Sequence, residues 1–123
     1  MTLTIDVSLV PDEIAHVANP PAAAAVIDVI RATTSITTAL DSGAASVTPA
    51  ETVEEARRLA VEGEALLCGE RSGVPPEGFD FGNSPGDYTS EHVEGRDLVF
   101  TTTNGTRAMR LTAATGSDGI WLA

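Results

Sequence analysis

Three short segments of the 123-residue chain each combine an arginine with small polar or acidic residues, directly after an apolar run. They are DVIRATT at residues 28–34, GERSG at residues 69–73 and TTTNGTR at residues 101–107. An arginine can hold a phosphate or a carboxylate with two parallel hydrogen bonds, and an acidic side chain can bind a cation. The three segments therefore favour a site for a small anion, assisted by a metal ion.

The third segment joins a strand-like run, residues 98–100, to a helical pattern. Gly105 allows the backbone to approach a ligand closely, and the first amides of a helix attract anions because they lack partners within the helix. The hydroxyls of Thr102, Thr103 and Thr106 add donors, and Arg107 adds a charge. The same residues are equally compatible with a helix start that is merely well capped.

The first two segments contribute the acidic residues Asp28 and Glu70. A carboxylate at the end of an apolar strand is costly to bury unless it is paired or binds a metal ion. The structural alternatives are an ion pair between Asp28 and Arg31 and a surface pair between Glu70 and Arg71. Mg²⁺ prefers few carboxylates together with water and phosphate oxygens, so these two residues are candidate magnesium ligands. A metal-activated water could then attack phosphorus while the arginines offset the developing charge.

The elements that must position these residues alternate between strands and helices. The expected strands span residues 2–9, 22–30, 46–51, 64–70, 98–100 and 118–123, and the expected helices span residues 33–42, 52–63 and 106–115. This order predicts one α/β domain over residues 1–123, a three-layer α/β/α arrangement with a mostly parallel or mixed central sheet. Because ligands bind beyond the carboxyl ends of such strands, we expect the three segments to meet at one edge.

A long segment, residues 71–90, contains four glycines and three prolines. Segments of that length in a compact domain usually carry function, although a rigid structural turn is the alternative. Within it, Asp80, Asn83 and Ser84 are the better site candidates. The two histidines, His16 and His92, are expected at the surface.

Composition excludes several partners. Eighteen acidic residues against seven arginines and no lysine give a net charge of −11, which repels nucleic acid and anionic membranes. No apolar run approaches the roughly 20 residues of a membrane span, and the N-terminus resembles no signal peptide, so a cytoplasmic location is expected. The single Cys68 excludes an internal disulfide and is expected to be structural. The final strand leaves an open edge, which makes a homo-oligomer a further expectation.

Four motifs together resemble the 2-phosphosulfolactate phosphatase family: VIDVIRATTSI, GERSG, GFDFGNSP and TTTNGTRA, in that order and at matching separations. The resemblance implies a three-layer α/β fold and Mg²⁺-dependent hydrolysis of 2-phospho-3-sulfolactate to sulfolactate and phosphate, on the route to coenzyme M. Family members are longer, so the chain resembles their N-terminal portion. By motif position, the resemblance implies site roles for Asp28, Arg31, Glu70, Arg71, Asn83, Asn104, Thr106 and Arg107.

Motif and residue chemistry together lead to a specific expectation. It is a Mg²⁺-dependent phosphatase for a small anionic 2-phospho hydroxy acid, and the alternative is a binding module that holds a phosphorylated or sulfonated acid without turnover. The expected catalytic residues are Asp28, Arg31, Glu70 and Arg107, with Asp28 and Glu70 also as metal ligands. The expected substrate-binding residues are Arg71, Asn83, Thr102, Asn104, Gly105 and Thr106.

Overall fold

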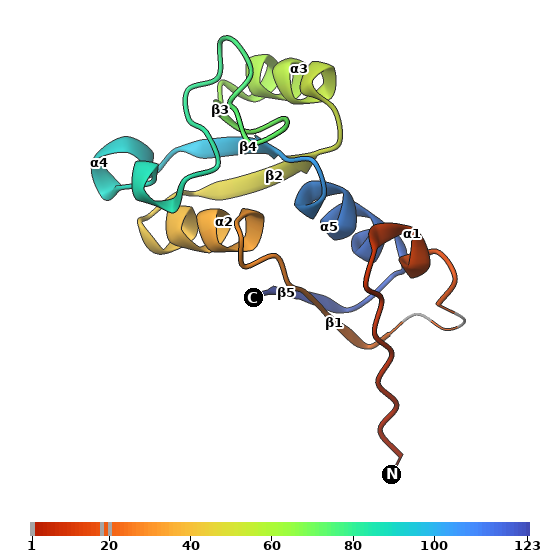
Figure 1. The fold of residues 1–123 in the computed structure, drawn as a ribbon. Helices are drawn as coiled ribbons and strands as arrows, with labels where there is room; N and C mark the ends of the chain where they lie inside the picture. The colour runs from red at the N-terminus through yellow and green to blue at the C-terminus, as the bar shows by residue number, and fades with distance from the viewer. Residues whose placement is uncertain (1, 18, 20) are drawn as a thin grey trace.

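The computed structural model describes residues 2–17, 19 and 21–123 (Figure 1). The helical elements are α1 (Pro11–Ile14), α2 (Ala32–Asp41), α3 (Val53–Gly63), the 3-10 turn η1 (Pro85–Asp87), α4 (Ser90–Val93) and α5 (Gly105–Ala114). The strands are β1 (Ala23–Val26), β2 (Ser46–Ala50), β3 (Leu66–Gly69), β4 (Asp97–Thr101) and β5 (Gly119–Leu122). The predicted α/β class is confirmed.

Every strand pair in the described part of the chain is parallel, as predicted. The strands form two hydrogen-bonded sheets, one with the order β2-β4-β3 and one that pairs β1 with β5. Helix α3 covers one face of the larger sheet, and α2 and α5 lie between that sheet and the β1-β5 pair (Figure 1). The central strand β4 is buried from Leu98 to Thr101, as expected for a strand that is covered on both faces.

The core is built on both faces of β4, because successive side chains of a strand point to opposite sides. Leu98 and Phe100 pack in the larger cluster, which also contains the buried Ile36, Tyr88 and Met109. Val99 points the other way, into the alanine-rich layer under α3.

Cys68 is fully buried within the larger apolar cluster. Burial raises the pKa of its thiol to about 12, so the side chain stays protonated and apolar near neutral pH. The structural role expected for this cysteine agrees with that placement.

One strand prediction near the N-terminus was wrong, and a second was only partly right. Residues 2–9, all of them described, form no strand, and their large apolar side chains are 74–85% exposed. In Figure 1 this segment extends away from the body of the molecule. The alternating pattern gives the segment one apolar face, but a strand also needs a neighbouring edge with which to form hydrogen bonds.

The strand expected at residues 22–30 is shorter, and it is not buried on both faces. It ends at Val26, and Ala23 and Ala25 are exposed. Beyond it the chain turns into α2, because the amide of Asp28 donates to the hydroxyl of Thr33 at 3.1 Å and the amide of Thr33 donates to the carbonyl of Asp28 at 3.1 Å.

Candidate functional site

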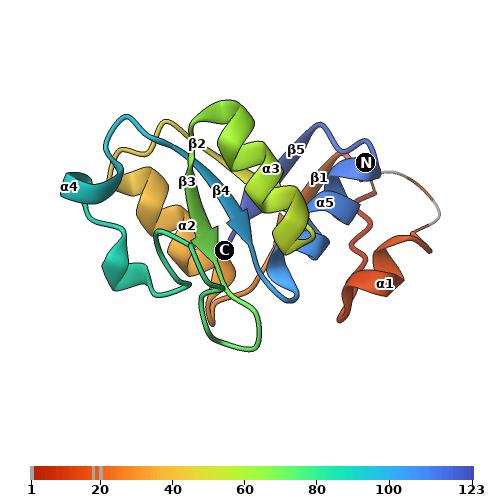
Figure 2. The same cartoon turned by 90° about the horizontal axis from the view of Figure 1, so that it is seen from above.

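The segments that follow β1, β3 and β4 leave the carboxyl ends of their strands toward one side of the molecule (Figure 2). Two contacts connect them. Thr103, after β4, contacts Glu70, after β3. Gly105, at the start of α5, lies against Asp28 and Ala32, after β1. The three motifs meet on one side of the molecule, as expected from the sequence, although β1 belongs to a different sheet from β3 and β4.

Glu70 connects two of these segments through hydrogen bonds. Its Oε1 accepts from the amide of Thr103 at 2.8 Å, and its Oε2 accepts from the amide of Gly73 at 2.7 Å. The hydroxyl of Thr103 also donates to Oε2, at 3.2 Å. The Glu70 residue is 8% exposed, so these bonds replace water around a buried carboxylate.

The pKa of Glu70 reflects two opposed effects. Burial raises it, but the amides of Thr103 and Gly73, the Thr103 hydroxyl and the charge of Arg71 together lower it below its ordinary value. Glu70 is therefore an ionised carboxylate whose charge is balanced mainly by backbone donors.

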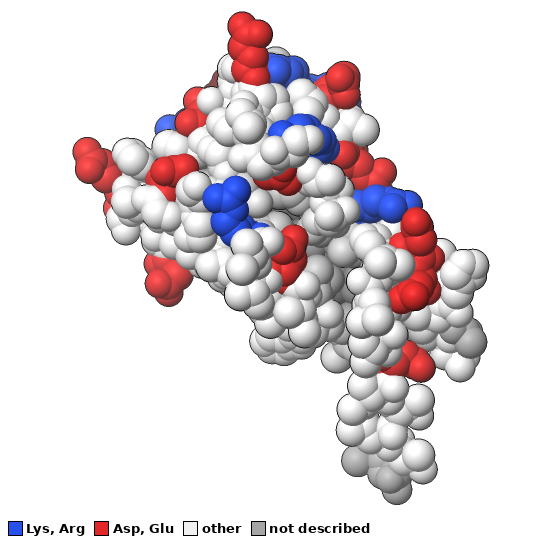
Figure 3. All heavy atoms as spheres, in the orientation of Figure 1, with Lys and Arg blue, Asp and Glu red and all other residues white. Residues whose placement is uncertain are grey.

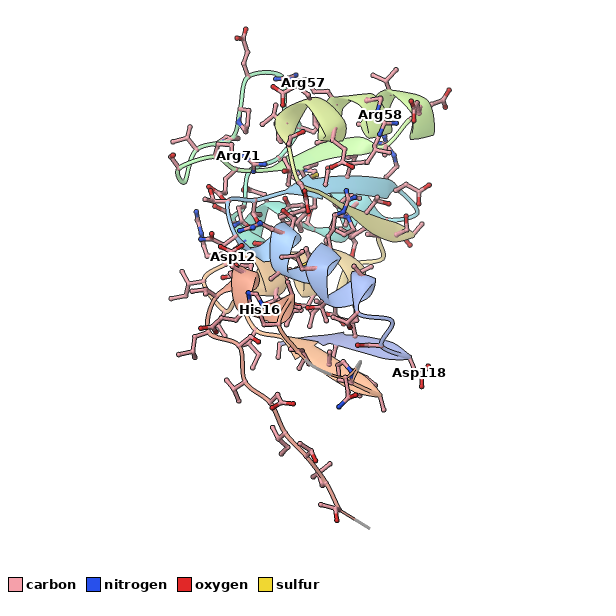
Figure 4. All side chains as sticks on the ribbon, turned by 90° about the vertical axis from the view of Figure 1, so that its right-hand side faces the viewer. Asp12, His16, Arg57, Arg58, Arg71 and Asp118 are labelled. Atoms are coloured by element: carbon pink, nitrogen blue, oxygen red, sulfur yellow. The ribbon has the colours of Figure 1, made fainter. Side chains whose placement is uncertain are left out.

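Arg71 makes no ion pair with Glu70. Its guanidinium donates to the main-chain carbonyl of Glu70 at 2.8 Å, to that of Glu51 at 2.6 Å and to the Thr101 hydroxyl at 2.6 Å. It thereby connects the ends of β2, β3 and β4. Figure 4 shows Arg71 where the loop after β3 leaves the sheet.

Asp28 meets the start of α5 because Gly105 has no side chain. A Cβ added at Gly105 would lie 2.5 Å from the Cβ of Ala32, 2.8 Å from Oδ2 of Asp28 and 3.2 Å from the hydroxyl of Thr102. The half-buried Asp28 carboxylate forms no ion pair or hydrogen bond with any described residue, so the alternative Asp28–Arg31 pair is not formed. A free carboxylate thus lies beside the first turn of a helix.

Thr102 and Thr106 bond to each other. The amide of Thr106 donates to the Thr102 hydroxyl, and the amide of Thr102 donates to the Thr106 hydroxyl, both at 3.1 Å. Both residues are buried. The Thr102 hydroxyl thus caps the helix, whereas Asn104 at the N-cap position is exposed and makes no capping bond with its side chain.

The GFDFGNSP motif approaches the start of α2. Arg31 donates to the hydroxyl of Ser84 at 3.3 Å, and the hydroxyl of Ser35 donates to the main-chain carbonyl of Asn83 at 3.1 Å. Asn83 is 7% exposed, and its Oδ1 has no partner among the described residues. Asp80 has a structural contact instead, because its Oδ2 accepts from the amide of Leu67 at 2.8 Å.

Arg107 lies away from the other candidates. Its guanidinium pairs with Asp12 of α1, and the two side chains are 48% and 73% exposed. As the third residue of α5, it projects toward α1, which packs beside that helix (Figure 1). His16 and His92 are exposed, as predicted.

One residue that was not proposed for the site emerges from these contacts: Ser35, which holds Asn83. It lies one turn into α2, four positions after the N-cap residue Arg31, so a signal was present in the sequence. Thr103 was expected as a hydroxyl donor to a ligand, and in the structure it bonds to Glu70.

The described residues contain no group of three or more His, Cys, Asp or Glu side chains arranged to hold a metal ion. Magnesium does not require such a group, because it retains water and takes substrate phosphate oxygens. The free carboxylate of Asp28 fits that requirement. Glu70 fits it less well, because three of the roughly four lone-pair positions of its carboxylate already accept hydrogen bonds.

The fold and this edge define an α/β protein with acidic, basic and hydroxyl groups gathered beyond its parallel strands. The sequence model described as 2-phosphosulpholactate phosphatase matches residues 8–122, and the chain belongs to this family. The expected family resemblance is confirmed.

Similar proteins carry the name probable 2-phosphosulfolactate phosphatase. One from Thermotoga petrophila is 52% identical over 86 residues, which cover 70% of this chain and 37% of the relative. One from Clostridium acetobutylicum is 47% identical over 110 residues, 88% of this chain and 47% of the relative. One from Symbiobacterium thermophilum is 50% identical over 103 residues, 81% of this chain and 43% of the relative. The chain spans less than half the length of these relatives.

No helix in the described part of the chain is long and apolar enough to cross a membrane.

Proposed function

We propose that this chain acts in the hydrolysis of a phosphate monoester of a small anionic hydroxy acid, of the 2-phosphosulfolactate type. Family membership supports the chemistry. The observation that carries the proposal is the free carboxylate of Asp28, placed against the first turn of α5 at the edge where the three motif segments meet.

Charge supports an anionic substrate. The chain carries −11 overall, and three of its seven arginines, Arg31, Arg71 and Arg107, come from the motifs. Arg31 and Arg71 lie at this edge, whereas Arg107 is directed away from it. Elsewhere arginines pair locally, as Arg58 does with Glu62, and Figure 3 shows basic and acidic side chains interspersed on the face it presents. Because the two acidic residues of the motifs lie beside these arginines, the edge suits a small anion bound together with a cation better than a polyanion such as a nucleic acid.

The residues have distinct roles in the proposal. The first amides of α5 and the guanidinium of Arg31 bind the phosphate oxygens, because both present donors toward the edge. Asn83 and Ser84 contact the part of the substrate away from the phosphate, since Arg31 connects their loop to the start of α2. Asp28 holds Mg²⁺, which would offset phosphate charge and acidify a water. The guanidinium of Arg71 holds the ends of β2, β3 and β4 together through its hydrogen bonds.

A second candidate is a module that binds the same anion without turning it over. The contacts of Arg71 and Arg107 favour it, because both guanidinium groups already bond to groups of the chain itself. On this alternative, phosphate or phospholactate stabilises the protein thermally and no product forms.

The assay that separates the two candidates is phosphate release from 2-phosphosulfolactate and 2-phospholactate, with Mg²⁺ and with EDTA. The phosphatase proposal predicts release that requires the metal and that Asp28→Asn abolishes. The matched control is Arg58→Ala, which removes an exposed charge that pairs only along α3. Ligand-induced stabilisation without release in the wild-type chain would favour the binding module.

A further inference from the structure

We propose that Glu70 is a positioning residue that fastens the turn before α5, and that Asp28 is the carboxylate available to a divalent cation. This inference rests on the proposed function, because it assigns different tasks to two acidic residues of the same site. It departs from the pairing of both residues as metal ligands that the sequence favoured.

The hydrogen bonds of Glu70 carry the argument. Each carboxylate oxygen accepts a bond from a main-chain amide, one from Thr103 at 2.8 Å and one from Gly73 at 2.7 Å. Oε2 accepts a second bond, from the Thr103 hydroxyl, so a metal ion there would displace a donor, and a metal ion at Oε1 would share that oxygen with the amide of Thr103. The Glu70 carboxylate thus accepts hydrogen bonds from the amides of two loops, the one after β3 and the one after β4.

The turn that Glu70 holds in place leads directly into α5. Thr103 lies between Thr102, whose hydroxyl accepts a hydrogen bond from the amide of Thr106, and the start of α5 at Gly105. Fixing the amide of Thr103 therefore fixes where the first turn of α5 begins. The backbones are joined there as well, because the amide of Glu70 donates to the carbonyl of Thr101 at 2.9 Å.

The carboxylate of Asp28, unlike that of Glu70, accepts no hydrogen bond from the described residues. Its Oδ2 would lie 2.8 Å from a Cβ added at Gly105, so it lies against the space that this glycine leaves open. No described residue bonds to its carboxylate. The start of α5 supplies neighbouring amides, and these attract the phosphate oxygens that would complete the coordination of a magnesium ion.

Replacement of Glu70 by glutamine separates the two roles. Glutamine has the same shape but only one side-chain oxygen, so in either orientation its NH₂ group meets one of the two amides that now donate to Glu70. A buried donor without an acceptor weakens the loop contact by roughly ten- to a hundredfold in equilibrium terms. The matched control is Glu77→Gln, a substitution at an exposed residue of the loop after β3.

The experiment uses the ¹⁵N-labelled 123-residue chain. Relative to wild type and Glu77→Gln, Glu70→Gln speeds hydrogen exchange of the Thr103 and Gly73 amides by about tenfold or more. It also weakens binding of inorganic phosphate by about tenfold, at a temperature where all variants are folded by circular dichroism. Affinity for Mn²⁺, a paramagnetic substitute for Mg²⁺, falls at least about tenfold in Asp28→Asn and less than about threefold in Glu70→Gln.

An equal loss of Mn²⁺ affinity in both variants would overturn the proposal, as would unchanged exchange at the two amides in Glu70→Gln. If Glu70→Gln does not fold, hydrogen exchange in the wild-type chain tests whether Glu70 is a metal ligand. Saturating Mg²⁺ leaves the exchange of the Gly73 amide within about twofold if Glu70 is no ligand, and changes it more if Glu70 coordinates the ion. Failure of wild type to bind Mn²⁺ or phosphate would defeat the proposed function, while the exchange data would still test the role of Glu70.

Discussion

The close contact between α2 and α5 predicts that alanine at Gly105 destabilises the protein. A Cβ at this position would lie 2.5 Å from the Cβ of Ala32, closer than two such carbons approach. The Ala32 Cβ has no rotamer by which to move away, so the two helix starts must separate. The carboxylate of Asp28, at 2.8 Å, would have to swing aside as well.

The size of the effect follows from two opposed terms. Replacing glycine by alanine in a helix ordinarily stabilises a protein by about 0.5–1 kcal/mol. Forcing a methyl group into a packed contact costs about 1–3 kcal/mol. We expect Gly105→Ala to lower the free energy of unfolding by about 1–2 kcal/mol and to weaken phosphate binding, because Asp28 and the first amides of α5 no longer share their present geometry.

Gly63 provides the matched control. It is the terminal residue of α3, and a Cβ there would meet its nearest neighbour at 4.0 Å, so Gly63→Ala gains helix propensity without a clash. Urea denaturation of both variants gives the free energies, provided that the slope with denaturant is unchanged. The packing argument is refuted if Gly105→Ala is as stable as Gly63→Ala, or if it binds phosphate like the wild type.

Three further outcomes are expected, all measured by urea denaturation. Because the folded-state pKa of Glu70 is lowered, its ionised form stabilises the fold above the unfolded pKa of about 4.5, and that contribution is lost as the pH falls through the folded pKa. The stability gap to Glu70→Gln therefore narrows as the pH falls below about 4.5, and a constant gap would contradict this linkage. Arg107→Ala changes stability by less than about 1 kcal/mol because its pair with Asp12 is exposed, and a larger loss would mean that the pair supports the fold. Ser35→Ala costs about 1–2 kcal/mol because it removes the donor to the carbonyl of buried Asn83, and a neutral result would show that this carbonyl finds another donor.

Elements with a strong local signal were predictable. The helix expected at residues 52–63 is present as Val53–Gly63. Its start has a local cause, because a Thr followed three residues later by a Glu is a capping pattern, and the hydroxyl of Thr52 accepts from the amide of Glu55 at 3.0 Å. The segment at residues 2–9 was not predictable in this way. Its alternation is a property of the segment alone, whereas a strand also depends on an edge that another part of the chain must supply.

In the site, too, some features were predictable from local sequence and others depended on distant parts of the chain. The parallel α/β pattern predicted that the three motifs would meet on one side of the molecule, because sites gather beyond the carboxyl ends of parallel strands. It did not predict that β1 would pair with β5 in a sheet separate from β3 and β4. The individual roles depend on loop conformation, which the sequence does not encode locally. Glu70 reaches an amide 33 residues away, and Arg107 takes its direction from the packing of α1 on α5.

The central claim is that the segments after β1, β3 and β4 and the GFDFGNSP loop form one anion site. The most direct test is an amide ¹H–¹⁵N titration of the wild-type chain with 2-phospholactate in the presence of Mg²⁺. The account predicts that the amides of Arg31, Ser84 and Gly105 shift together with a single dissociation constant, while the control amide of Glu77 stays in place. Shifts confined to the start of α5, or separate dissociation constants for the three amides, would contradict it.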